Sequence, residues 1–260
     1  MQKTGLVIPC YNEAARLNPA AFQEVLAANA ELSFVFVNDG STDETLRVLR
    51  EVAAAFADRV AVLDLERNMG KAEAVRRGML LAIERRFELV GYWDADLATP
   101  LNAINDFCRV LEAPEIDMVI GSRVRLLGRK IERRAARHYL GRVFATCASL
   151  LLGISVYDTQ CGAKIFRNTE WLRKVWARPF KVRWTFDVEM LARFPIVMGV
   201  VPGEACRRWI EFPLHEWADV KGSKIRKGDF VQGGIEFCRL FLLLATPARK
   251  GYEKYLRQGP

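Results

Sequence analysis

Four short apolar runs, separated by segments of helical spacing, constrain the fold of this chain more than any other feature. The runs lie at residues 6–8, 34–37, 60–63 and 89–93. Each is nearly continuous in apolar side chains, as strands covered on both faces require. The segments with helical spacing lie between them at residues 19–31, 43–57 and 70–86. This alternation predicts parallel strands joined by right-handed crossovers, and therefore a doubly wound α/β sheet flanked by helices.

The pattern continues with a helix near residues 101–112 and a strand near 116–121, and it changes after Gly121. A further helix is expected at 133–152. Residues 230–246 form a second apolar segment, but Glu236 and Arg239 interrupt it, and it falls short of the about 20 residues that a membrane span needs. We therefore expect one domain over residues 1–227 and an amphipathic helical segment over 228–260.

Composition fits a folded, reduced protein. Of the 260 residues, 51% are hydrophobic and 27% are charged, which is enough to bury a full core. The cysteines contain no C-x-x-C pair, so they are expected to be reduced, small core residues of a cytosolic protein. Two histidines offer too little material for a structural zinc site. Because an apolar run begins within a few residues of Met1, no secretory leader is expected.

Acidic residues follow several of the predicted strands. Glu13 comes after the first strand, Asp39 after the second, and Asp94 and Asp96 after the fourth. Ligands of open parallel sheets bind beyond the carboxyl ends of the strands. Burying several acids together is costly unless a cation or hydrogen-bond donors compensate their charge. This edge of the sheet is therefore the predicted ligand-binding site.

Asp94 and Asp96 form a D-x-D step at a strand end. Such a step offers two carboxylates to one hard cation, while phosphate oxygens and water fill the remaining positions, as Mg²⁺ or Mn²⁺ prefers. The alternative is a helix N-terminus, with Asp96 or Thr99 as the cap and Pro100 in the first turn. Capping alone does not explain two acids, so the metal interpretation is favoured.

The segment NDGSTD at residues 38–43 follows the second strand. It has the composition of a strand-to-helix turn, with Gly40 giving backbone freedom and Ser41 or Asp43 capping the next helix. Asp39 lies one step beyond the strand. It is therefore placed to accept hydrogen bonds from a base or a ribose.

The net charge of +8 is concentrated in one short segment. Its cations are Arg123, Arg125, Arg129, Lys130, Arg133, Arg134, Arg137 and Arg142. Such a patch suits phosphates, nucleic acid or an anionic membrane surface, or it consists of solvated and paired surface charges. The interleaved aromatic residues of a nucleic-acid-binding protein are missing, so no nucleic-acid partner is expected.

Five motifs occur in a fixed order over the first half of the chain. They are IPCYNE (8–13), NDGSTD (38–43), NMGK (68–71), DAD (94–96) and GSR (121–123). Together they resemble glycosyltransferase family 2, which has the GT-A fold. The later motifs DTQCGAK (158–164), WTFDVE (184–189) and WADVKGSK (217–224) resemble its polyprenyl-phosphate branch. Within that branch the dolichyl-phosphate glucosyltransferases are nearest, and the dolichol-phosphate mannosyltransferases are a step further away.

The resemblance implies a role for each matching residue. Pro9, Tyr11, Glu13 and Asp39 would surround the nucleoside, and Lys71 would belong to the same donor site. Asp94 and Asp96 would bind the metal and the donor diphosphate, with Arg123 and Arg137 holding phosphate groups. Arg133 and Arg134 are rivals of Arg137 on the same helix, and Asn38 stands where the family frequently has aspartate.

The resemblance also implies an inverting transfer of a hexose, with glucose from UDP-glucose preferred, to dolichyl or undecaprenyl phosphate. Residues assigned to the acceptor side are Arg134, Asp158, Gln160, Asp187, Glu189 and Ser223. Lys224 is assigned to catalysis, in a phosphate-closing loop with Lys221, Arg226 and Lys227. The alternative is a saccharide or other hydroxyl acceptor, which requires a general base, for which Asp158, Asp187 and Glu189 are the candidates. Capping with an ordinary ion pair is the simpler interpretation of Asp187 and Glu189.

The helices at 133–152 and 230–246 would rest on a bilayer if the acceptor is a lipid. A core or dimer-interface position is the alternative for both helices, and the oligomeric state stays open. With these expectations the protein would be cytoplasmic and peripheral on the cytoplasmic face of a membrane.

Overall fold

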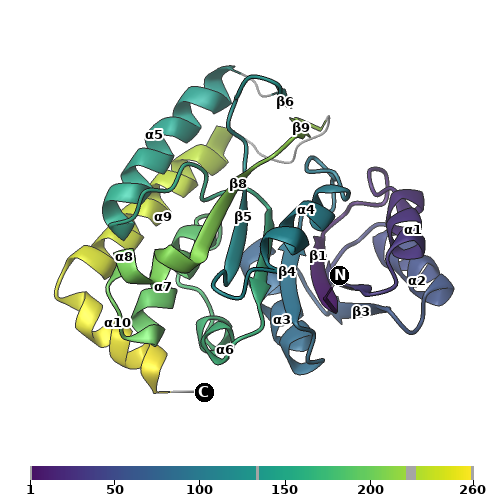
Figure 1. The fold of residues 1–260 in the computed structure, drawn as a ribbon, viewed down its shortest axis with the longest axis horizontal. Coiled ribbons are helices and arrows are strands. Elements are labelled where there is room, and N and C mark those ends of the chain that lie inside the picture. Colours follow the sequence, from purple (N-terminus) through teal and green to yellow (C-terminus); the bar gives the residue numbers. More distant parts are fainter. Residues whose placement is uncertain (1, 133–134, 221–226, 259–260) are drawn as a thin grey trace.

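The computed structural model describes residues 2–132, 135–220 and 227–258, with side chains throughout except at 135–138 and 227–230. Within these ranges a seven-stranded sheet runs through the centre of the molecule (Figure 1). In spatial order its strands are β3 (Val60–Leu65), β2 (Leu32–Asp39), β1 (Thr4–Cys10), β4 (Leu89–Trp93), β7 (Ala163–Arg167), β5 (Met118–Ser122) and β8 (Trp209–Pro213). Only β7 runs antiparallel to its neighbours, so the predicted mainly parallel α/β fold is confirmed.

Helices cover both faces of the sheet. One face carries α1 (Pro19–Ala28), α2 (Thr45–Ala55) and α4 (Ala103–Val110). On α1, the ring of Phe22 meets those of Phe34 and Phe36 of β2 edge-on at 5.4 and 5.2 Å between centroids. In β1 the apolar side chains alternate, with Leu6 and Ile8 on this face and Val7 on the other. The strand is therefore apolar throughout because both of its faces are buried.

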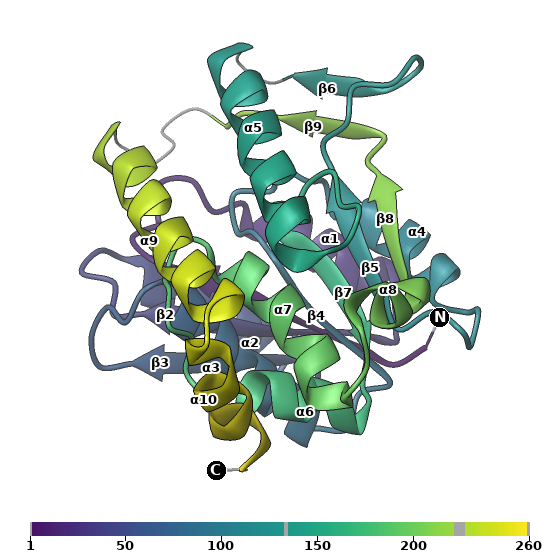
Figure 2. The same ribbon diagram turned by 90° about the vertical axis from the view of Figure 1, so that its left-hand side faces the viewer.

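The opposite face carries the larger helical layer (Figure 2). Its members are α3 (Lys71–Glu84), α5 (Ala135–Leu152), α6 (Glu170–Ala177), α7 (Phe186–Met198), α9 (Lys227–Ala245) and α10 (Ala248–Arg257). Leu240 and Leu244 of α9, and Tyr252 and Leu256 of α10, belong to the same buried cluster as the sheet residues. One side of the C-terminal segment is therefore part of the main core. No helix in the described ranges combines the length and the apolar character needed to cross a bilayer.

A second, two-stranded sheet lies at one end of the molecule. It pairs β6 (Lys130–Glu132) with β9 (Glu216–Ala218) in parallel. Trp217 of β9 is 9% exposed and Ile131 of β6 is 8% exposed. Between β8 and α7 lie the short helix α8 (Pro202–Ala205) and a 3₁₀ turn at Cys206–Arg208.

Several expectations from the sequence are wrong. The run at 60–63 is an edge strand and is only half-buried, because a sheet edge has a neighbour on one side alone. The expected strand near 116–121 is present as β5, and it is separated from β4 by β7, a strand that was not predicted from the sequence. The six cysteines all lie within the described residues and form no disulfide there, but Cys147 and Cys238 are exposed on α5 and α9 and are not core residues.

The strand order places a crevice beside β1. The chain winds outward from β1 through β2 to β3 and then returns to β4 on the other side of β1, which is a topological switch point. Pairing between β1 and β4 ends at Val7 and Tyr92, whereas β1 continues to Cys10 beside β2. Pro9 lies beyond the last β4 partner, where its missing N–H costs no bond to that strand. The two strands therefore separate where the acidic residues begin.

Candidate active site

Asp94 and Asp96 lie in the turn that follows β4. The Asp94 Oδ1 atom accepts a hydrogen bond from the Lys71 ammonium at 2.5 Å. The Asp96 Oδ1 atom accepts one from the backbone N–H of Ala98 at 3.1 Å, across a turn in which Leu97 has φ of 54°. Helix α4 begins at Ala103 with Asn102 at its N-cap. The interpretation of Asp96 or Thr99 as a helix cap is therefore wrong.

The charges around this turn influence one another. Burial raises the pKa of Asp96, and the like charge of Asp94 raises it further. Burial lowers the pKa of Lys71, but the nearby carboxylates of Asp94, Asp187 and Asp96 outweigh that effect and raise it above its ordinary value. The acidic pair thus lies in a setting that favours a bound cation.

The pair fits a divalent cation in its donor chemistry. Both side chains offer hard carboxylate oxygens, and the Lys71 ammonium already places a positive charge against Asp94. No group of three or more His, Cys, Asp or Glu side chains in the described residues could hold a metal ion. Mg²⁺ and similar cations are commonly held by one or two carboxylates together with phosphate oxygens of a substrate, and two carboxylates are what this turn supplies.

Asp39 closes the crevice on the β2 side. Its two carboxylate oxygens accept hydrogen bonds from the backbone N–H groups of Met69 at 2.6 Å and Gly70 at 2.9 Å. Gly70 has φ of 89°, a conformation that favours glycine, and it directly precedes α3. Burial raises the pKa of Asp39, while these two bonds and the nearby Arg183 act in the opposite direction. The loop at 69–70 is therefore fastened to the end of β2.

The loop after β1 is tied to the loop after β2. The Asn12 backbone N–H donates to the Ser41 hydroxyl at 2.9 Å, and the Asn12 side chain accepts from the Thr42 N–H at 2.8 Å. The Glu13 N–H donates to the Thr45 hydroxyl at 2.7 Å. Tyr11 is 38% exposed beside these contacts. The two loops thus form one wall that leaves an aromatic ring accessible.

Acidic side chains in this wall have different partners. Glu13 forms a two-pronged ion pair with Arg16. Asp43 accepts from the N–H of Thr45 at 3.0 Å, but the N-cap residue of α2 is Glu44, so the interpretation of Ser41 or Asp43 as the helix cap is wrong. The Asn38 amide donates to Asp64 at 2.7 Å. An aspartate at position 38 would place two carboxylates together, which gives a physical reason for the asparagine.

Arg123 and Asp158 form a buried ion pair on the far side of β4. The guanidinium donates to both carboxylate oxygens, at 2.6 and 2.7 Å, and it lies over the ring of Trp217 at 5.4 Å. Burial lowers the pKa of Arg123, but Asp158 raises it well above its ordinary value, with a further contribution from Asp94. Arg123 is therefore a permanent cation close to the acidic pair.

Gly162 lies directly against Asp94. A Cβ atom at position 162 would be 1.9 Å from one carboxylate oxygen of Asp94 and 2.2 Å from its Cγ. Two residues further along the chain, the fully buried Lys164 ammonium donates to Asp187 at 2.5 Å and to the Cys161 carbonyl at 2.6 Å. Asp187 also accepts a hydrogen bond from the Tyr92 hydroxyl. This support holds the start of α7 beneath the turn that carries the pair.

The remaining acceptor-side candidates lie in different surroundings. Glu189 is fully buried and bonds to Arg193 at 2.7 Å, so it faces the core between α7 and its neighbours. The side-chain nitrogen of Gln160 is buried and has no hydrogen-bond partner among the described residues. Arg134, Ser223 and Lys224 lie outside the described residues, as do Lys221 and Arg226. Arg137 belongs to α5 by its backbone, while its side chain and that of Lys227 lie outside the description.

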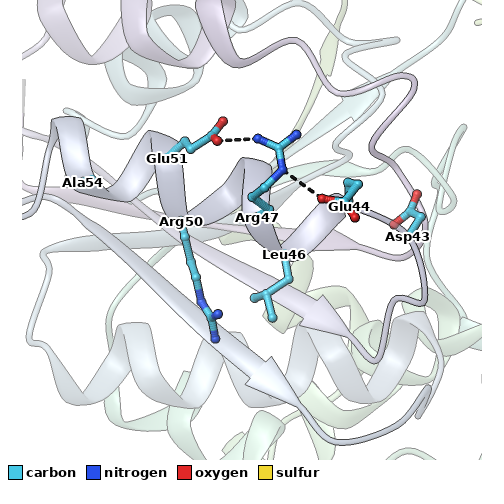
Figure 3. Close-up of a pocket in the computed structure, with 7 residues that line it drawn as sticks. All are labelled: Asp43, Glu44, Leu46, Arg47, Arg50, Glu51 and Ala54. Carbon is cyan, nitrogen blue, oxygen red and sulfur yellow. Dashed lines mark hydrogen bonds and ion pairs between the residues drawn. The ribbon is translucent and has the colours of Figure 1, made fainter.

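A separate hollow lies on the outer surface of α2 (Figure 3). It is lined by Asp43, Glu44, Leu46, Arg47, Arg50, Glu51 and Ala54. Arg47 pairs with Glu44 and with Glu51 across successive turns of the helix. Arg50 pairs instead with Asp64 of β3 at 3.6 Å, so the arginines that line this hollow already have carboxylate partners.

Sequence reasoning missed several residues of the site. Arg16, Arg183 and Lys164 each contact or support a predicted residue. Lys164 and Gly162 belong to the DTQCGAK motif, and Arg183 directly precedes WTFDVE. The motifs therefore indicated the right segments, but they gave no role to these particular residues.

The sequence model of the family described as "Glycosyl transferase family 2" matches residues 6–176. The chain belongs to glycosyltransferase family 2. Among curated family relatives, a dolichyl-phosphate beta-glucosyltransferase of Drosophila melanogaster is 32% identical over 240 residues, covering 85% of this chain and 68% of that protein. One from Trichomonas vaginalis is 28% identical over 250 residues, with 91% and 70% covered.

Solved structures show the fold of this family 2 enzyme. Glucosyl-3-phosphoglycerate synthase of Mycobacterium tuberculosis, in complex with Mn²⁺ and UDP-glucose, superposes with a TM-score of 0.66. That match has 17% identity and covers 95% of this chain and 80% of the other. The likeness confirms the GT-A fold that the motifs predicted.

Proposed function

We propose that this family 2 glycosyltransferase moves glucose from UDP-glucose to the phosphate of a polyprenyl lipid, dolichyl or undecaprenyl phosphate. The observation that carries the proposal is the acidic pair Asp94 and Asp96 at the switch point, with Lys71 on one side and Arg123 on the other. The similarity to dolichyl-phosphate beta-glucosyltransferases supports the choice of sugar and acceptor.

The donor would lie across the carboxyl ends of β1, β2 and β4. Asp39 and the wall formed by the loops after β1 and β2 would take the nucleoside, with Tyr11 as an accessible ring. A divalent cation, Mg²⁺ or Mn²⁺, held by Asp94 and Asp96 would neutralise charge on the leaving diphosphate. Lys71 and Arg123 would stabilise the same charge as it develops.

In the transfer, an oxygen of the acceptor phosphate forms a bond to the anomeric carbon from the side opposite the diphosphate. The bond between that carbon and the diphosphate oxygen breaks, and its electron pair leaves with UDP, which inverts the anomeric centre. An ionised phosphate oxygen carries no proton that must be removed. The amide nitrogen of Gln160, which has no hydrogen-bond partner among the described residues, is suited to bind that phosphate.

A hydroxyl acceptor would need a free general base. Among the three candidates, Asp158 is paired with Arg123, Asp187 with Lys164 and Glu189 with Arg193. Each carboxylate is thus already engaged by a cation. This arrangement supports the phosphate acceptor over the hydroxyl acceptor.

The test mixes purified protein, Mn²⁺ or Mg²⁺, a short polyprenyl phosphate and a panel of labelled UDP- and GDP-sugars. We expect label from UDP-glucose to enter the organic phase only when the metal is present, because the product is a lipid. Label that stays water-soluble on an added saccharide would show the hydroxyl acceptor instead. Transfer of label from a different nucleotide sugar would show that the donor is not UDP-glucose.

The outer surfaces of α5 and α9 support a membrane location for this reaction. Leu140, Val143, Cys147 and Leu150 are exposed along α5, and Val231, Ile235, Cys238 and Leu242 are exposed along α9. Both sets have the three- and four-residue spacing of a single helix face. The helices lie side by side (Figure 2), with the rings of Phe144 and Phe237 5.4 Å apart. We propose that this apolar surface rests on the cytoplasmic face of a membrane.

Replacing Leu242 with glutamate is expected to weaken binding to vesicles of phosphatidylcholine and phosphatidylserine by about tenfold, because burying one leucine side chain contributes about 1.5–3 kcal/mol. Leu242 is 60% exposed and Val201, in the loop before α8, is 66% exposed, so Val201→Glu is the matched control. Co-sedimentation measures both. Equal binding of the two variants would place the membrane contact elsewhere.

A further inference from the structure

Glu236 lies on the buried side of α9, although its charge interrupts the apolar sequence of that helix. The residue is 1% exposed. One carboxylate oxygen accepts hydrogen bonds from the backbone N–H groups of Arg183, Trp184 and Thr185, at 3.1, 2.7 and 3.2 Å. Thr185 is the N-cap residue of α7 and makes no cap bond with its own side chain. A carboxylate from α9 therefore holds the turn that enters α7, at the positive end of that helix.

The same turn reaches the donor side of the site. The Arg183 guanidinium donates to the Met69 carbonyl at 2.8 Å and lies 3.1 Å from where a Cβ of Gly70 would be. From the opposite side, the N–H groups of Met69 and Gly70 donate to Asp39. Residues 69–70 are thus held between Arg183 and Asp39, and Lys71 follows them directly.

The turn also reaches the metal side of the site. Asp187, in the first turn of α7, bonds to Lys164 and Tyr92 beneath the acidic pair. A shift of the turn at 183–185 would therefore move contacts on both sides of the diphosphate position. Without the Glu236 carboxylate, the N–H groups that it binds would lose an acceptor inside the protein, where water replaces it poorly.

We propose that Glu236 is a positioning residue for the donor. By holding the backbone at 183–185 it fixes Arg183, and through Arg183 it fixes the loop at 69–70 that closes on Asp39. The inference rests on the proposed use of a UDP-sugar. It assigns to α9, a helix with one exposed apolar face, a second role in the geometry of the nucleotide site.

The test is a double-mutant cycle on UDP affinity, measured by calorimetry in the presence of Mn²⁺ with the full chain. Glu236→Gln weakens the acceptor, and Arg183→Met removes the contact to Met69 while leaving the Glu236 bonds in place. Each single change is expected to weaken UDP binding by about tenfold. Because both act through the same loop, the double variant is expected to be little weaker than either single variant. The KM for the polyprenyl phosphate should stay unchanged.

Glu253→Gln is the control, since Glu253 lies on α10 and pairs with Arg249 at 2.8 Å away from the site. The positioning role would be overturned if the losses of UDP affinity in the two single variants multiply in the double variant. It would also be overturned by a lower melting temperature with unchanged UDP affinity. Wild-type protein that binds no UDP would instead overturn the proposed function, and this inference with it.

Discussion

Asp94→Asn and Asp96→Asn are each expected to lower kcat by about 10²- to 10³-fold, and Asp96→Asn is expected to change the melting temperature little. Asparagine keeps the shape of the side chain but removes the charge that would hold the cation, and losing one such electrostatic contribution typically has an effect of this size. The stability of Asp96→Asn should hold because the two carboxylates repel each other in the folded protein, where the charge of Asp94 helps to raise the pKa of Asp96.

Initial rates of lipid labelling and calorimetric titration of UDP with Mn²⁺ measure these effects separately. Glu66→Gln is the matched control, because Glu66 directly follows β3 at the same edge of the sheet and is exposed. Asp94→Asn is also expected to lower the melting temperature, because it leaves the Lys71 ammonium without its ion-pair partner. Full activity of either asparagine variant would remove the acidic pair from the mechanism.

Gly162→Ala is expected to lower kcat/KM by about 10²-fold while the protein stays folded. The added methyl group would meet the Asp94 carboxylate at 1.9 Å, so that carboxylate must turn away from its position beside Lys71. Overpacking of this kind costs about 1–3 kcal/mol of stability, whereas a misplaced catalytic group loses activity far more steeply. The predicted defect is therefore in Mn²⁺-dependent UDP binding and turnover.

Gly203→Ala provides the comparison, because a Cβ at position 203 meets nothing within 4 Å. Thermal unfolding followed by circular dichroism shows whether the Gly162 variant keeps its fold, and calorimetry shows whether it keeps its Mn²⁺-dependent affinity for UDP. Unchanged affinity and turnover would mean that Asp94 can move without consequence.

Much of the fold could be predicted because apolar runs mark strands that are covered on both faces. β1, β2 and β4 are buried along nearly their whole length, and their sequences show it. β3 has an equally apolar core but lies at the sheet edge. The sequence of a strand does not show how many neighbouring strands it will have in the sheet. The partial exposure of β3 could therefore not be predicted.

β7 was not predicted because its burial depends on a distant partner. Lys164 lies within this strand, and a lysine normally argues against a buried position. Here Asp187 from α7 supplies the opposite charge and Cys161 supplies a carbonyl. Such compensation between segments far apart in sequence cannot be read from either segment alone.

The same limit applies to the candidate site. The positions of Asp39, Asp94 and Asp96 follow from strand ends, which local sequence reveals. Glu236 carries no such signal, because its partners are backbone N–H groups at 183–185. In the sequence it is only a charge within an apolar helix.

The position of β7 between β4 and β5 also bears on how the chain assembles as the ribosome makes it. β1, β2 and β3 emerge first, and β4 can pair with β1 soon afterwards. The other edge of β4 must wait for β7, which pairs Trp93 with Ala163 and follows α4 and α5 in the chain. Gly162 arrives at Asp94 in the same late step, so the nucleotide side of the crevice is expected to take shape before the acidic turn gains its final support.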